Sequence, residues 1–127
     1  MKPLLALAPA MLLSACATAD AGGPPTRQWL VGTWLLIEPD LQFPLACSSG
    51  LPITYNPDGT YRRFGERGVW RLEGDRLHEG ATEADEAEEA RIGVTVVNRI
   101  VRRGRDEMEK RFQNGGTATL LRCPPRP

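Results

Sequence analysis

Three short turn sequences constrain the fold of this 127-residue chain more than any other feature. Asn56-Pro57-Asp58-Gly59 is a strong turn signal, because proline pre-sets one backbone dihedral and glycine accepts a positive one. Two further turns are expected at residues 73–75 (Glu-Gly-Asp) and 114–116 (Asn-Gly-Gly). With 13 glycines and 11 prolines, the chain favours many short strands joined by turns over long helices.

The segments on either side of these turns have the character of short strands. We expect strands at residues 28–37, 51–55, 60–64, 68–72, 76–79, 92–102, 107–113 and 117–122. Trp70 should face inward and Arg71 outward, because alternate residues of a strand point to opposite faces. Tyr61 and Phe64 have opposite parity, which predicts a bulge or a change of buried face in their strand. Eight short sequential strands predict an all-β fold, a small antiparallel up-and-down barrel.

Several of these motifs resemble the small lipocalin-like domains of bacterial secreted proteins and lipoproteins. The motifs are Gly32-Thr33-Trp34, Asn56-Pro57-Asp58-Gly59-Thr60-Tyr61, Gly68-Val69-Trp70-Arg71-Leu72 and Gly74-Asp75-Arg76-Leu77. In lipocalins, the tryptophan of Gly-x-Trp closes one end of an eight-stranded barrel beneath an arginine side chain. The resemblance gives this role to Trp34, with Arg122 near the last expected strand as a possible partner.

The N-terminus has the pattern of a secretory signal, in which a basic start and an apolar run precede a small-residue cleavage site. A transmembrane helix needs about 20 apolar residues, whereas the run at residues 3–13 is shorter and contains two prolines. Leu13-Ser14-Ala15-Cys16 resembles the bacterial lipobox. The resemblance implies cleavage before Cys16, lipidation of its thiol and attachment to a membrane.

The lipobox also sets the expected domain organisation. We expect a lipoprotein signal peptide at residues 1–15, the lipidated cysteine and a flexible tether at 16–27, a lipocalin-like barrel at 28–123 and a tail at 124–127. Ala17 stands where the inner-membrane retention signal of many such proteins carries Asp. By that analogy, the protein is anchored in the outer membrane and faces the periplasm.

Cys47 and Cys123 are the two thiols that remain when Cys16 is lipidated. In an oxidising periplasm, an isolated pair is expected to form a disulfide. A metal site would need three or four ligands, and His78 is the only histidine. A redox pair would normally lie closer together in sequence. We therefore expect a structural disulfide, with neither a metal nor another cofactor.

The distribution of charge argues against several classes of partner. The chain carries 16 basic and 16 acidic residues, which gives no general attraction to nucleic acid. Seven basic residues between Arg91 and Arg111, Lys110 among them, lack interleaved aromatics and are expected on outer strand faces. The acidic segment at residues 79–90 offers a conceivable calcium site, but its spacing lacks a calcium-loop pattern. A solvated loop or one helical turn is the favoured interpretation of that segment. The carboxylates considered for calcium are Asp85, Glu86, Glu88 and Glu89.

No catalytic residue is predicted. His78 lies in an expected strand without a Gly-x-Ser-x-Gly motif or a comparable nucleophile context, which favours a surface or rim position. Paired carboxylates of the acidic segment would lack a rigid element to hold them for glycosidase chemistry. We therefore expect a membrane-anchored, non-enzymatic protein that acts by binding.

Two binding hypotheses follow from a small barrel. In the first, the barrel holds a small apolar ligand, and its wall residues are Trp34, Tyr55, Tyr61 and Trp70. The simpler interpretation of these aromatics is core packing. In the second, a packed barrel recognises a periplasmic protein through its outer loops, as an inhibitor-like or accessory envelope lipoprotein. An enclosed apolar pocket above about 300 Å³ would favour the ligand. A filled interior with an exposed apolar patch would favour the protein partner.

Overall fold

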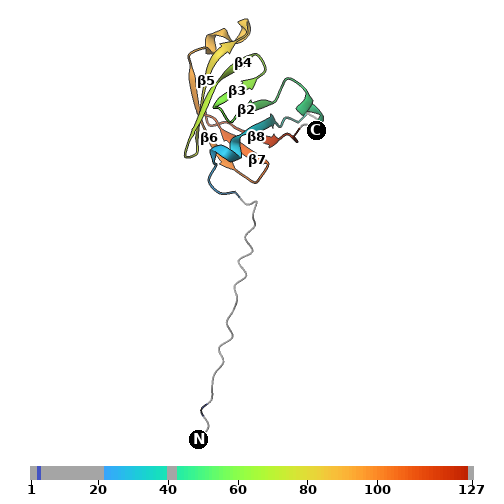
Figure 1. Cartoon of the computed structure of the whole chain (residues 1–127), viewed down its shortest axis with the longest axis vertical. Helices are drawn as coiled ribbons and strands as arrows, with labels where there is room; N and C mark the ends of the chain where they lie inside the picture. The colour runs from blue at the N-terminus through green and yellow to red at the C-terminus, as the bar shows by residue number, and fades with distance from the viewer. Residues whose placement is uncertain (1–2, 4–21, 40–42, 126–127) are drawn as a thin grey trace.

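The computed structural model describes residue 3, residues 22–39 and residues 43–125. The described residues form eight antiparallel strands that close into one barrel (Figure 1). The strands are β1 (Gly32–Leu36), β2 (Ile53–Tyr55), β3 (Thr60–Arg63), β4 (Glu66–Glu73), β5 (Arg76–Ala84), β6 (Thr95–Arg102), β7 (Glu107–Arg111) and β8 (Thr117–Arg122). Each strand pairs with its sequence neighbours and β8 pairs with β1, which confirms the predicted up-and-down barrel.

Tight turns join the strands where the sequence predicts them. Between β2 and β3, the backbone N–H of Gly59 donates to the carbonyl of Asn56 at 3.1 Å. Gly59 has a φ of +88°, in the region that side chains disfavour, so this turn needs its glycine. The predicted turns at residues 73–75 and 114–116 likewise connect β4 to β5 and β7 to β8.

A short helix, α1 (Arg27–Leu30), replaces the start of the strand predicted from residue 28. The side chain of Thr26 caps this helix by accepting a hydrogen bond from the N–H of Trp29 at 3.2 Å. Trp29 and Leu30 are both buried against the barrel core. The prediction was wrong here because a nearly continuous apolar run fits a strand and a buried helical turn equally well.

Two apolar residues that were predicted to lie in strands lie outside them. Leu51 precedes β2 and is 55% exposed, and Phe64 follows β3 and is 76% exposed. Phe64 lies in the turn between β3 and β4, so it does not have to share a buried strand face with Tyr61. The bulge predicted in β3 is therefore not needed. The register shift occurs instead between β4 and β5, at Arg67/Gly68.

The acidic segment is more regular than predicted. β5 extends through residues 79–84, the first half of this segment, and ends at Ala84. A 3-10 helix, η2 (Glu86–Arg91), follows it. The backbone N–H of Asp85 donates to the carbonyl of Gly65 at 2.9 Å, which joins this segment to the β3–β4 turn. The strand predicted from residue 92 begins only at residue 95.

The predictions made for the N-terminus fall on residues that the structure does not describe. These include the lipobox, Cys16 as the lipid-attachment residue and residues 17–21 of the tether. Those assignments therefore stay predictions. In the part of the chain that is described, no helix is long and apolar enough to cross a bilayer.

Candidate binding surface

All four aromatic residues predicted to line a ligand cavity lie in the barrel core. Trp34, Tyr55, Tyr61 and Trp70 are at most 4% exposed and belong to one buried cluster. The ring centroids of Tyr55 and Trp70 are 5.6 Å apart, and those of Trp34 and Trp29 are 5.1 Å apart, both edge-to-face. An eight-stranded barrel has an interior just wide enough for side chains to fill, and these rings fill part of it.

Trp34 lies directly beneath an arginine, as the lipocalin resemblance implies. The guanidinium carbon of Arg122 is 4.3 Å from the Trp34 ring centroid. The same guanidinium donates to the carbonyl of Val31 at 2.9 Å and pairs with Asp106 at 3.1 Å. The indole N–H of Trp34 donates to the carbonyl of Leu30 at 2.9 Å. These contacts attach the last strand to the segment around α1.

A second part of the interior holds a buried ion pair that the sequence analysis missed. Lys110 Nζ lies 2.7 Å from Glu79 Oε1, and both side chains are at most 8% exposed. The hydroxyl of Tyr55 donates to Glu79 Oε2 at 3.3 Å and lies 3.4 Å from Lys110 Nζ. Burial, followed by the charge of Glu79, raises the pKa of Tyr55 well above its ordinary value.

The placement of Lys110 on an outer strand face was wrong. Lys110 and Met108 are both buried, because they occupy alternate positions on the inward face of β7. The alternation along β7 indicates an inward position for Lys110, whereas the charge of its side chain favours an outward one.

Glu66 is the centre of a second buried cluster. The hydroxyl of Tyr61 donates to Glu66 Oε2 at 2.7 Å, and Arg63 Nη2 lies 2.7 Å from the same oxygen. Arg91 Nε lies 3.0 Å from Glu66 Oε1, an ion-pair contact without hydrogen-bond alignment. Burial, followed by the hydrogen bond to Glu66, raises the pKa of Tyr61. Because Arg91 ends η2, this cluster joins η2 to the β3–β4 hairpin.

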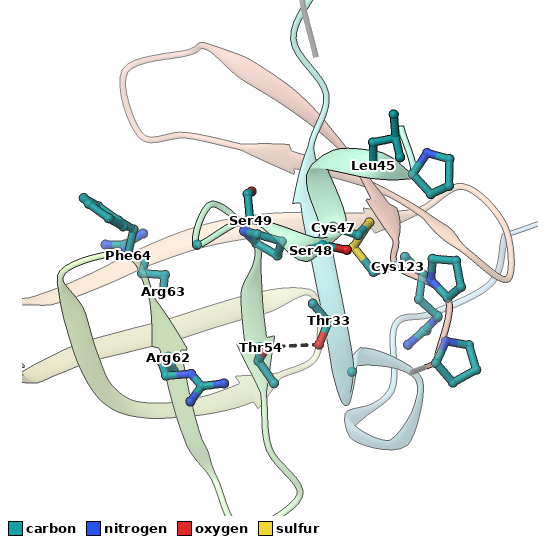
Figure 2. A pocket seen from close by; sticks show the side chains of 17 residues that line it. Thr33, Leu45, Cys47, Ser48, Ser49, Thr54, Arg62, Arg63, Phe64 and Cys123 are labelled. Carbon is teal, nitrogen blue, oxygen red and sulfur yellow. Dashed lines mark hydrogen bonds between the residues drawn. A yellow bond between two sulfur atoms is a disulfide. The ribbon is translucent and has the colours of Figure 1, made fainter. Parts of the chain in front are cut away.

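A surface groove with a volume of about 1110 Å³ lies beside the disulfide. We call it the disulfide groove; it is lined by residues 32–33, 44–45, 47–50, 52, 54, 62–64 and 122–125. Its floor includes the hydroxyls of Thr33 and Thr54, which lie 3.0 Å apart (Figure 2). Phe64 lies to one side of this floor, and the disulfide lies to the other (Figure 2).

Cys47 and Cys123 form the predicted disulfide, with Cα atoms 5.8 Å apart across 76 positions of sequence. Cys47 lies in the 3-10 helix η1 (Leu45–Ser48), and Cys123 directly follows β8. The backbone N–H of Cys123 donates to the carbonyl of Thr33 at 2.8 Å. The disulfide therefore ties η1 to the end of β8, which is hydrogen-bonded to β1.

Large apolar side chains remain exposed at the groove. Phe64 is 76% exposed and Leu45 is 71% exposed, and both line the groove. Phe43 and Leu51, which neighbour lining residues in sequence, are also exposed. Single exposed apolar residues are ordinary, but two or more of them at the edges of one hollow are typical of a binding surface.

His78 lies on β5 between buried neighbours, so its side chain faces outward. Its Nε2 is 3.2 Å from a carboxylate oxygen of Glu73, and its Nδ1 is 3.3 Å from Arg71 Nη2. Both ring nitrogens therefore contact charged side chains of β4.

The acidic segment does not form a metal site in the structure. Among the described residues, no group of three or more His, Cys, Asp or Glu side chains is arranged to hold a metal ion. Glu88 instead forms an ion pair within η2, where its Oε2 lies 3.8 Å from Arg91 Nη1.

A scan against protein-family models, and searches of curated proteins and of solved structures, find no match for this chain.

Proposed function

We propose that this protein is a lipid-anchored envelope protein whose packed barrel acts as a non-enzymatic protein-binding module. The disulfide groove is the proposed binding surface. One observation carries the proposal: the aromatic residues inside the barrel are packed against one another, whereas Phe64 and Leu45 are left exposed around an open groove. This is the combination that favours a protein partner over an enclosed apolar ligand.

The contents of the barrel interior speak against an apolar ligand there. Such a ligand would have to displace packed rings such as Tyr55 and Trp70. It would also have to lie close to the buried pair of Glu79 and Lys110. Burial of charged groups is costly unless their partners and hydrogen bonds are kept, so an apolar occupant would gain little.

The size and chemistry of the groove suit a polypeptide segment. Its volume of about 1110 Å³ lies at the upper end of the range of small-molecule pockets, roughly 300–1,000 Å³, so it can hold several residues of an extended chain. Exposed Phe64 and Leu45 supply the apolar contacts that commonly anchor protein interfaces. The hydroxyls of Thr33 and Thr54 supply polar groups on the floor between them.

The proposed role is binding without catalysis. The two ring nitrogens of His78 contact Glu73 and Arg71, so the imidazole faces charged neighbours instead of a hydroxyl or thiol nucleophile. Stable membrane attachment would come from Cys16, because the lipobox resemblance implies several acyl chains and two or more lipid signals are needed for stable anchoring.

Cell fractionation tests the anchor. We expect the natural chain in the membrane fraction and a Cys16→Ser chain in the soluble periplasmic fraction. The lipid assignment fails if the Cys16→Ser chain is still membrane-bound.

Site-specific photocrosslinking tests the groove. A photoreactive phenylalanine derivative is placed at position 64, and at position 94 as a control. Val94 is 51% exposed and does not line the groove. We expect one discrete protein adduct from position 64 and none from position 94.

Identification of that adduct must then be followed by direct binding of the purified partner. Thr54→Trp fills the groove from its floor and should abolish this binding while leaving the circular dichroism spectrum unchanged. The proposal is wrong if positions 64 and 94 give the same products, or if the purified partner binds the Thr54→Trp chain as well as the natural one.

A further inference from the structure

The proposed function leaves open what kind of segment the groove recognises. Building on that function, we infer that the occupant is an extended protein segment with a carboxylate next to an apolar side chain. The carboxylate binds Arg62, and the apolar side chain packs against Phe64. Three observations carry this inference: the charges that line the groove, the engagement of two of its arginines, and the neighbours of the third.

The disulfide groove is lined by positive charge alone. Arg62, Arg63 and Arg122 contribute to its lining, and no Asp or Glu is among the described residues that line it. The rest of the lining consists of glycines, prolines, the disulfide, and hydroxyl-bearing and apolar side chains. A partner that buries this surface must neutralise the arginines, because an unpaired charge is costly to bury.

Two of the three arginines already have partners. Arg63 lies 2.7 Å from Glu66, and Arg122 lies over Trp34 and pairs with Asp106. None of the ion pairs formed by the described residues involves Arg62, and its side chain is exposed. Arg62 is therefore the groove cation that is available to a ligand.

The strand register leaves Arg62 without an acidic neighbour on either side. Arg62 pairs directly with Arg67 on β4 and with Thr54 on β2. Like charges directly opposite each other destabilise an antiparallel pair. Arg67 has Glu83 opposite it on β5, whereas Thr54, the direct neighbour of Arg62 on β2, carries no charge. A carboxylate bound at Arg62 would remove this repulsion and would accept a bidentate pair of hydrogen bonds from the guanidinium.

The apolar part of the segment follows from the position of Phe64, two residues after Arg62. Figure 2 shows the Phe64 ring on the same side of the groove as Arg62 and Arg63. The ring packs near Gly50 of the opposite loop, since a Cβ built there would lie 3.2 Å from Phe64 Cδ2. A chain that lies along the floor therefore meets the cation and the ring in succession.

A protein segment suits this geometry better than a membrane surface. The arginines and the apolar side chains surround a hollow, which an extended chain can enter and a flat layer of lipid headgroups cannot follow. We therefore commit to a polypeptide, and a lipid occupant becomes one of the outcomes of the test.

Selection from a random heptapeptide library tests the inference on the full chain carrying Cys16→Ser. The natural groove should enrich Asp or Glu beside an apolar residue. Arg62→Gln should lose this acidic bias, and Arg62→Glu should replace it with Lys or Arg. Arg76→Glu is the matched control, because Arg76 is exposed, lies outside the groove and changes the net charge equally. That control should keep the acidic bias.

The affinity of one enriched peptide should fall about 10- to 100-fold with Arg62→Gln, as expected for a hydrogen-bonded charge pair. The affinity should also fall with added salt. Circular dichroism and thermal unfolding of each variant verify that the barrel is intact.

The outcomes separate this inference from the proposed function. If no enriched peptide is blocked by Thr54→Trp, the protein-binding role of the groove fails. If blocked peptides are enriched without an acidic bias, or the bias survives Arg62→Gln, only the present inference is overturned. Vesicles of phosphatidylglycerol and phosphatidylethanolamine are the lipid probe. Arg62-dependent binding to these vesicles, together with Arg62-independent peptide binding, would also overturn it.

Discussion

The inside of the barrel and the disulfide groove use apolar side chains in opposite ways. Inside, Trp34 and Trp70 are packed on other rings, and their indole N–H groups donate to backbone carbonyls at 2.9 and 3.1 Å. At the groove, most of the surface of Phe64 and of Leu45 is exposed to solvent. The aromatic residues that look most like ligand contacts in the sequence therefore hold the fold together. In the proposed function, the exposed apolar residues that line the groove are the ones that bind.

Removing the disulfide should have the largest effect, because it ties the groove to the barrel. We expect Cys47→Ser with Cys123→Ser to lower the free energy of unfolding by about 4.5 kcal/mol, from the loop of 76 positions that the bond closes. Urea denaturation of the oxidised chain and of the double variant measures this. A loss below about 1 kcal/mol would show that the barrel does not depend on the bond.

Breaking the buried ion pair should lower the stability of the barrel and leave binding at the groove unchanged. Lys110→Ala leaves the Glu79 carboxylate buried without its cation, and should cost about 3–5 kcal/mol. Replacing both residues, as Lys110→Met with Glu79→Leu, should recover most of that loss. Chemical denaturation measures the stability, and the photocrosslinking yield at position 64 is the control for the groove. A near-neutral Lys110→Ala variant would contradict the interior described for this barrel.

Alkaline pH should lower the free energy of unfolding gradually, because it acts on tyrosines buried in the barrel. Burial raises the pKa of both Tyr55 and Tyr61, the only tyrosines of the chain, so the folded state favours their neutral forms. Their contribution to stability is present below the ordinary tyrosine pKa of about 10 and is lost as the pH rises through the raised folded values. Absorbance at 295 nm should show delayed ionisation in the folded chain and ordinary ionisation in urea. Ordinary titration in both states would contradict the packed interior.

Truncating the groove should have the smallest effect on stability. Phe64→Ala removes a ring that is 76% exposed, so the free energy of unfolding should change by no more than about 0.5 kcal/mol. Binding of the partner or of an enriched peptide should nevertheless be weakened, because the ring is part of the groove wall. The matched control is Trp70→Ala, for which core truncation predicts a loss of about 3–5 kcal/mol. Equal losses of stability in the two variants would show that the groove residue supports the fold as much as the core residue does.

The barrel could be predicted from the sequence because its turns carry their own chemistry. The Asn-Pro-Asp-Gly turn and the alternation of Trp70 and Arg71 identified hairpins with known inward faces. The helix α1 was missed because its apolar residues gave no period that separates helix from strand. Buried Lys110 was missed because its partner, Glu79, is 31 positions away and lies on a strand that does not pair with β7.

The groove could not be predicted because no single stretch of sequence contains it. Its walls come from β3, from the loop that carries η1 and from the residues that follow β8. The disulfide gave one distance between two of these segments, but not the position of Phe64 or of Arg62. The strand register supplies the position of Arg62, since it places that residue between Arg67 and Thr54.

Native mass spectrometry of the chain isolated gently from its own envelope tests the central claim most directly. The account predicts a barrel that carries no small molecule in its interior and that retains a polypeptide, which is lost from the Thr54→Trp variant. A small apolar molecule retained at one copy per chain, in the natural protein and in Thr54→Trp alike, would show that the inside of the barrel is the binding site and would contradict the account.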